Sequence, residues 1–240
     1  MPKQLRIGLV LPDVLGTYGD DGNALVLRQR ARMRGIPAEI ERVTIDDQIP
    51  ADCDIYTIGG GEDSAQVIAS ARLAASPGLQ AAVADNRPVF AVCAGMQVLG
   101  RTFNAHGSTV EGIGLLDVTT TAMDKRAIGE VASSPTRAGL TAQLTEPLTG
   151  FENHMGGTVL GPDASALGTA SRGVGNNAGG DSSEGVVQGS VVATYMHGPA
   201  LARNPQLADL LLAHALDMKL ADLEPLELSE IDRLRMERLR

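Results

Sequence analysis

The first hundred residues alternate between short apolar runs and segments with helical spacing, and this alternation constrains the fold more than any other feature. The pattern predicts strands within 5–12, 38–45, 53–61 and 88–93, and helices within 21–35, 62–76 and 78–85. Strands that alternate with helices usually form a parallel sheet with helices on both faces. The sequence therefore predicts an α/β fold with a mostly parallel central sheet.

From about Ile113 the sequence pattern changes. Shorter strands separated by Gly and Pro turns are expected within 114–124, 129–134, 148–161 and 184–198. The Gly/Asn/Ser-rich stretch 173–185 is expected to be a loop with no packing signal, and 204–219 a helix that covers the sheet. No composition break divides the chain, so we expect a single domain over 1–240. Its C-terminal helix, about 226–240, has a thin apolar stripe, which favours a solvated helix over a docking helix.

Composition excludes several classes of partner. A net charge of −9 argues against nucleic acid or an anionic membrane surface. No apolar run is long enough to span a bilayer, and the N-terminus lacks a signal-peptide pattern. Two cysteines without Cys/His pairing give neither a disulfide framework nor zinc-site spacing. These features predict a reduced, cytoplasmic protein without membrane insertion and without a bound metal.

Cys93 ends an apolar run and is followed by the small residues Ala94 and Gly95, after which a helical pattern begins. A nucleophile on a strand-to-helix turn needs such small neighbours, because its side chain projects above the sheet while the backbone turns sharply. A helix N-terminus also favours a thiolate. The alternative is a structural cysteine at the end of a strand, which is the reading we favour for Cys53, where no turn follows.

A thiol nucleophile needs a base, and the histidines differ in their setting. His197 follows a strand that runs into a Gly-Pro turn, and α/β proteins assemble their sites at such strand ends. His197 is therefore the first choice and His154 the second, while His106 and His214 are expected to be exposed or structural. The glycine run 59–61 matches neither a P-loop nor a dinucleotide-binding motif, and it could supply backbone N–H groups to an oxyanion.

Together these motifs resemble the class I (triad) glutamine amidotransferases, most closely the cobyric-acid-synthase-like branch and, within it, the glutaminase subunits of lipid II isoglutaminyl synthases. The resemblance spans essentially the whole chain, and the order of "GFENH" before "YMHGP" is its most specific part. It is carried by the segments 18–36, 53–66, 92–100, 150–157, 173–177 and 194–199. The resemblance implies a flavodoxin-like sandwich with added antiparallel strands.

The resemblance also implies roles for individual residues. Cys93 would attack the side-chain amide of L-glutamine, and His197 would transfer the proton. The implied oxyanion-hole residues are Gly60, Gly61 and Ala94, and the implied substrate-binding residues are Arg126, Gln97, Asn153 and His154. No cofactor is expected in this chain.

The sequence departs from the pattern of many class I enzymes at the third catalytic residue. Many class I enzymes carry a Glu two residues after the catalytic histidine, and this chain has Pro199 there. The cobyric-acid-synthase-like branch also lacks a Glu at this position. Asp20 is the candidate third member, with Glu152 behind it, and a Cys-His dyad also stays open.

The resemblance further implies a partner, because the chain has no ATP-binding motif. A MurT-like Mur ligase subunit, holding ATP and Mg, would receive the ammonia and amidate D-glutamate of lipid II to D-isoglutamine in peptidoglycan synthesis. The expected assembly is a heterodimer at the inner face of the membrane. The alternatives are an amidotransferase of cobyrinic or cobyric acid synthesis and a non-catalytic regulatory subunit.

Overall fold

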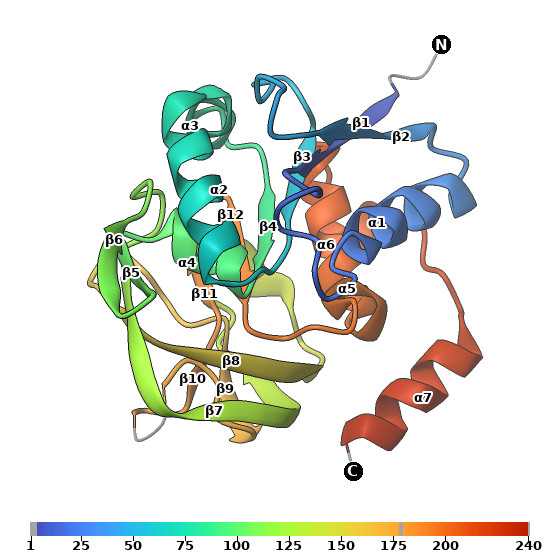
Figure 1. The fold of residues 1–240 in the computed structure, drawn as a ribbon. Coiled ribbons are helices and arrows are strands. Elements are labelled where there is room, and N and C mark those ends of the chain that lie inside the picture. Colours follow the sequence, from blue (N-terminus) through green and yellow to red (C-terminus); the bar gives the residue numbers. More distant parts are fainter. Residues whose placement is uncertain (1–3, 178–179, 240) are drawn as a thin grey trace.

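A parallel sheet forms the centre of the molecule, as the strand–helix alternation predicts (Figure 1). The structure is a computed structural model that describes residues 4–177 and 180–239. The strand order is β11-β12-β4-β3-β1-β2, and every neighbouring pair is parallel except β11 with β12. Its strands are β1 (Leu5–Val10), β2 (Ala38–Val43), β3 (Ile55–Ile58), β4 (Val89–Val92), β11 (Val186–Gln188) and β12 (Val191–Thr194).

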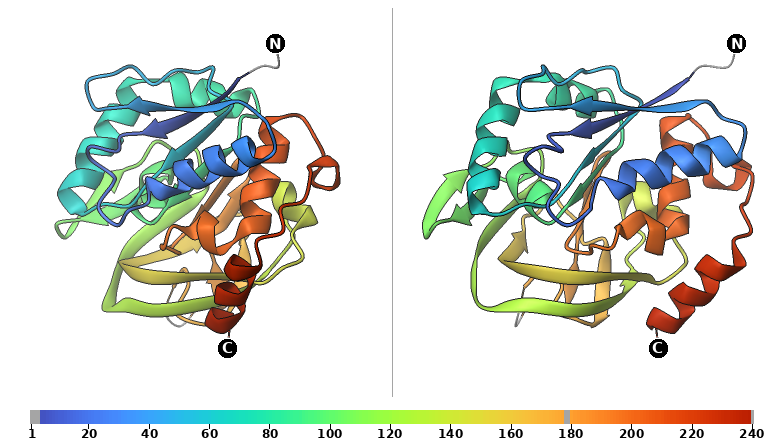
Figure 2. Two further views of the ribbon diagram at one scale, coloured as in Figure 1. Left: turned by 90° about the vertical axis from the view of Figure 1, so that its right-hand side faces the viewer. Right: turned by 45° about the vertical axis from the view of Figure 1, so that its right-hand side comes forward.

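Helices cover both faces of this sheet. On one face α1, α5 and α6 pack together, and α2, α3 and α4 lie on the other (Figures 1 and 2). The helices are α1 (Gly22–Met33), α2 (Asp63–Ala75), α3 (Gly78–Ala84), α4 (Ala94–Leu99), α5 (Ala200–Arg203), α6 (Pro205–Ala215) and α7 (Ser229–Leu239), with 3₁₀ turns at Gly139–Gln143 and Leu220–Asp222. The buried side chains between these layers are almost all aliphatic, in keeping with an aromatic content of 2%.

A second sheet, mainly antiparallel, packs below the first (Figure 1). Its order is β10-β9-β7-β5-β6, and β8 pairs with β7. Its strands are β5 (Thr102–Ala105), β6 (Ser108–Glu111), β7 (Val118–Pro135), β8 (Leu148–Leu160), β9 (Gly168–Arg172) and β10 (Ser183–Glu184).

The strands of this second sheet correct the sequence prediction in two places. The segments 114–124 and 129–134 are predicted to be separate strands, but residues 118–124 and 129–134 both belong to the 18-residue strand β7. Pairing with β8 resumes after a register shift between Ala122 and Ala127, so the polar residues there form a bulge rather than a turn. The β5–β6 hairpin was not expected, and its turn is made by His106 and Gly107, both with positive φ.

The Gly/Asn/Ser-rich segment 173–185 is mostly a loop, as predicted, but it ends in β10 and part of it is packed, which its composition does not predict. Asn176 is fully buried, and its side-chain amide donates to the Gly185 carbonyl while its Oδ1 accepts the Gly185 N–H, each at 2.8 Å. This buried amide therefore links the two ends of the segment, whereas residues 180–182 stay exposed. Residues 178–179 of this predicted loop lie outside the described residues.

The C-terminal helix α7 lies beside β8 (Figure 2), and its arginines pair with carboxylates just before β8 and in β7. Arg235 Nη1 lies 2.8 Å from Glu146 Oε2, and Leu234 and Met236 stay about half exposed. The helix starts at Ser229, and Arg240 of the predicted segment is outside the described range. None of the described helices has the length and apolarity needed to cross a bilayer.

Candidate active site

The site lies at the carboxyl edge of the central sheet, where three neighbouring strands end together. In the registers of β3, β4 and β12, Ile58 lies opposite Ala91 and Thr194 opposite Val92. The segments that leave these strand ends carry the glycine run 59–61, Cys93 and His197. The carboxyl edge of a parallel sheet is where α/β proteins bind ligands, so topology alone brings these predicted residues together.

Cys93 sits on a strained turn between β4 and α4. Its backbone has φ 53° and ψ −109°, a conformation that side chains with a Cβ rarely adopt. A Cβ on Gly95 would lie 2.9 Å from the Ile58 carbonyl oxygen, so only glycine fits this approach. The Cys93 N–H donates to the Thr194 carbonyl at 2.8 Å. This is the nucleophile-elbow geometry that the small residues after Cys93 predict.

The other cysteine has a different environment. Cys53 is fully buried in the core, and desolvation, assisted by Glu41, raises the pKa of its thiol to about 12. A thiol with such a pKa stays protonated and unreactive at neutral pH.

His197 is the histidine beside Cys93. Its Nδ1 lies 3.1 Å from both carboxylate oxygens of Asp20, so Nε2 is the nitrogen left for proton transfer with the thiol. Burial lowers the pKa of His197, but interactions with Asp20 and Cys93 raise it by more, to about 10. The imidazolium form is therefore stabilised next to Cys93.

Asp20, from the loop between β1 and α1, is the carboxylate that the structure brings against His197. It is 2% exposed, and its Oδ2 also accepts the Gly60 N–H at 2.9 Å. Glu152, the second candidate, is not in this position. Its oxygens accept the N–H groups of Val174 at 2.8 Å and Gly175 at 2.9 Å, so it holds the segment after β9 instead.

The oxyanion-hole prediction needs one correction. The Gly60 N–H is bonded to Asp20, so it is not free to bind an oxyanion. A hydrogen bond from the Gly61 N–H is not seen within the described residues, and Ala94 opens α4, where N–H groups have no partner inside the helix. Gly60 leaves room for the pair instead, because a Cβ there would lie 3.1 Å from both His197 Cε1 and Asp20 Oδ2, which is closer than most Cβ contacts.

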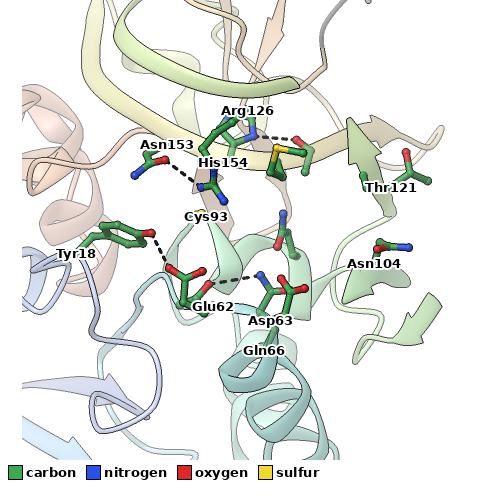
Figure 3. Close-up of a pocket in the computed structure, with 15 residues that line it drawn as sticks. Tyr18, Glu62, Asp63, Gln66, Cys93, Asn104, Thr121, Arg126, Asn153 and His154 are labelled. Atoms are coloured by element: carbon green, nitrogen blue, oxygen red, sulfur yellow. Dashed lines mark hydrogen bonds between the residues drawn. The ribbon is translucent and has the colours of Figure 1, made fainter. Parts of the chain in front are cut away.

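A pocket of about 260 Å³ opens beside Cys93 and extends to Arg126 (Figure 3). Arg126 projects from the β7 bulge, and its Nη1 donates to Asn153 Oδ1 at 3.0 Å. The volume is below the ~300–1,000 Å³ of pockets for drug-sized ligands, so the pocket suits a small ligand. Arg126, Asn153, His154 and Gln97, the predicted substrate-binding residues, all line it.

His154 and Gln97 are held by a buried network under the pocket, which the sequence reasoning missed. Gln97 Nε2 donates to the Tyr195 hydroxyl at 3.0 Å, and His154 stacks on the Tyr195 ring at a centroid distance of 3.6 Å. His154 Nδ1 lies 2.8 Å from the Gly156 carbonyl oxygen. His154 is thus a wall residue rather than the base for Cys93, and Tyr195 could have been found from its place two residues before His197.

Other lining residues were also missed. Tyr18 and Glu62 face the pocket from the β1–α1 loop and from the start of α2 (Figure 3). Both lie inside segments that carry the family resemblance, which is the signal that could have singled them out. The described residues contain no cluster of three or more His, Cys, Asp or Glu side chains suited to a metal ion.

Comparisons with known proteins agree with this geometry. The model of the CobB/CobQ-like glutamine amidotransferase domain matches residues 6–205. The chain is 35% identical to the lipid II isoglutaminyl synthase (glutamine-hydrolyzing) subunit GatD of Staphylococcus aureus, over 94% of this chain and 90% of that protein. The subunit of the same name from Streptococcus pneumoniae is 34% identical over 91% of this chain and 83% of that protein.

Among solved structures, the glutaminase domain of Trypanosoma brucei CTPS with bound acivicin has the same fold. The TM-score is 0.56 at 15% identity, over 90% of this chain and 95% of that chain. The match confirms the flavodoxin-like α/β class predicted from the sequence. This chain belongs to the CobB/CobQ-like family of glutamine amidotransferases.

Proposed function

We propose that this protein is the glutaminase subunit of a lipid II isoglutaminyl synthase. The observation that carries the proposal is its similarity, over nearly the full length of both chains, to two subunits named as glutamine-hydrolyzing parts of that enzyme. The juxtaposition of Cys93, His197 and Asp20 supports the hydrolytic role.

In the proposed mechanism, Cys93 Sγ attacks the side-chain amide carbon of L-glutamine. The oxyanion that forms is stabilised by the N–H groups of Gly61 and Ala94. His197, charged and oriented by Asp20, donates a proton from Nε2 to the departing nitrogen, which leaves as ammonia. Water, deprotonated by His197, then hydrolyses the glutamyl thioester to glutamate and regenerates the thiol.

Arg126 is proposed to bind the α-carboxylate of glutamine. A guanidinium suits a carboxylate because its N–H groups form paired, charge-assisted hydrogen bonds. Asn153 holds this guanidinium through its Oδ1. The distance along the pocket from Cys93 to Arg126 would then select for the length of the glutamine side chain.

The ammonia is proposed to pass to a MurT-like ATP-dependent ligase subunit, which would hold ATP and Mg and amidate D-glutamate of lipid II. The chain would act in the cytoplasm, in a heterodimer that meets the lipid substrate at the inner face of the membrane. Both relatives are named as subunits, which supports a multi-chain enzyme.

The test compares two nitrogen sources in an amidation assay with lipid II, ATP and the ligase subunit. With L-glutamine, the wild-type chain supports amidation and Cys93→Ala does not. With ammonium chloride, both support it, because ammonia bypasses the thiol. Failure of the wild-type chain to support amidation with glutamine overturns the proposal, and amidation of a cobyrinate instead would favour cobyric acid synthesis.

A further inference from the structure

The pocket beside Cys93 has an uneven distribution of charge along its wall. Arg126 lies on one side, and the carboxylates of Glu62 and Asp63 lie on the opposite side, at the start of α2 (Figure 3). L-Glutamine carries a positive α-ammonium next to its negative α-carboxylate. Arg126 can bind only the carboxylate, so the ammonium needs an anionic partner elsewhere in the wall.

Glu62 is held in place by Tyr18. The Tyr18 hydroxyl donates to Glu62 Oε1 at 2.8 Å, and this hydrogen bond, together with burial, raises the pKa of Tyr18 to about 12. The phenol therefore stays protonated and remains a donor through the neutral and alkaline range. The bond uses only Oε1, and no hydrogen bond to Oε2 is seen in the described part of the chain.

Tyr18 also places this carboxylate relative to the reacting groups. Its ring lies 4.9 Å from the His197 ring, and Tyr18 lines the pocket together with Cys93 and Arg126. Glu62 is thus hydrogen-bonded to a side chain that packs on His197 and lines the same pocket as Cys93 and Arg126. A glutamine bound with its carboxylate on Arg126 would have its α-ammonium in this pocket.

Asp63 and Glu62 have different hydrogen-bond partners. Asp63 Oδ2 accepts the His106 N–H at 2.8 Å and lies 3.8 Å from the His106 ring, so Asp63 fastens the β5–β6 turn to α2. Asp63 is the neighbour of Glu62, has the same charge and lines the same pocket. It therefore serves as a matched control.

Gln66 adds a second acceptor one helical turn after Glu62. It is 6% exposed and lines the pocket, and its Oε1 has no hydrogen-bond partner among the described residues. A buried acceptor without a partner costs free energy unless a ligand satisfies it. An ammonium group, with three donors, can pair with a carboxylate and an amide oxygen together.

We propose that Glu62, oriented by Tyr18 and assisted by Gln66, binds the α-ammonium of glutamine and makes the enzyme specific for a free α-amino acid. The inference rests on the proposed glutaminase function. It assigns Glu62 to substrate recognition and Tyr18 to positioning. Amides that keep the carboxylate and lack the ammonium are then poor substrates.

The experiment measures ammonia release by the full-length chain, with the ligase subunit present, from L-glutamine and from glutaramate, which lacks only the α-amino group. For Glu62→Gln we expect kcat/KM for glutamine to fall by about 10- to 100-fold, because a charge-assisted hydrogen bond is lost. The kcat/KM of this variant for glutaramate should stay within about 3-fold of the wild-type value. The preference for glutamine over glutaramate is then lost. Asp63→Asn should retain the wild-type preference.

Tyr18→Phe provides a second variant that keeps the ring against His197. We expect its KM for glutamine to rise with little change in kcat, and no change for glutaramate. Equal losses on both substrates in Glu62→Gln, or an unchanged preference, overturn the inference while leaving the glutaminase proposal intact. A wild-type chain that releases no ammonia from glutamine overturns the proposed function and the inference with it.

Discussion

His197 Nδ1 lies 3.1 Å from both carboxylate oxygens of Asp20, and the same carboxylate accepts the Gly60 N–H. Asp20 therefore orients the histidine and holds the glycine-rich strand end at the same time. Because 177 residues separate Asp20 from His197 in the chain, this arrangement depends on the whole sheet being assembled.

Asp20→Asn tests the orienting role. Removing the charge should lower the pKa of His197 from about 10, because Asp20 is a main cause of its elevation. Since the proposed mechanism needs the protonated imidazole as a donor, the alkaline limb of the pH profile of kcat/KM should move to lower pH. We also expect kcat to fall by about 10²- to 10⁴-fold.

Asp21→Asn is the matched control for that variant, because Asp21 is adjacent and pairs with Arg42 at 3.5 Å instead of His197. Its pH profile should follow that of the wild type. An Asp20→Asn profile with an unmoved alkaline limb and near-normal kcat would mean that a Cys-His dyad suffices.

Arg126→Ala tests whether Arg126 binds the α-carboxylate of glutamine. The variant should raise KM for glutamine by about 10- to 100-fold with a smaller effect on kcat, because a charge-assisted pair to the substrate is lost away from the reacting bond. Lys125→Ala, the neighbouring cation, should leave KM unchanged. Steady-state ammonia release measures both, and equal KM values for the two variants would refute the assignment.

Glu184→Gln tests a buried carboxyl beneath the site. Glu184 is fully buried, and desolvation raises the pKa of its carboxyl from 4.5 to about 7. The folded state thus favours the protonated form, so this group reduces stability as the pH rises from 4.5 through 7, by about 3 kcal/mol in all.

The Glu184→Gln variant should therefore gain stability over the wild type at pH 8 and show little gain at pH 4.5. Urea unfolding at both pH values checks the difference. Glu39→Gln, on the exposed side of β2, is the control and should show no such trend. A gain for Glu184→Gln that is equal at both pH values would contradict the assigned titration.

The sequence was most informative where local chemistry and topology agree. The small residues after Cys93 predicted the elbow, and the strand–helix alternation predicted a parallel sheet whose carboxyl edge gathers Cys93, His197 and the glycine run. Asp20 was found only through the family resemblance, because a loop residue after β1 has no local pattern that points to a histidine far along the chain. The structure places Asp20, and not Glu152, against His197.

Other features depended on tertiary contacts that no local pattern reveals. The bulge that aims Arg126 into the pocket lies inside one long strand, and its polar residues resemble a turn in the sequence. The assignment of Gly60 to the oxyanion hole failed because its N–H is taken by a distant carboxylate. Asn176 and Glu184 are buried in a segment whose composition is typical of an exposed loop.

The proposed mechanism depends on covalent catalysis by Cys93, which ammonia release from L-glutamine by two cysteine variants tests. Cys93→Ala should lose activity to the background level, while Cys53→Ala, which alters a buried core thiol away from the pocket, should keep it. The wild type should also form a glutamyl adduct that mass spectrometry assigns to Cys93. Ammonia release by Cys93→Ala at the wild-type rate would contradict the account.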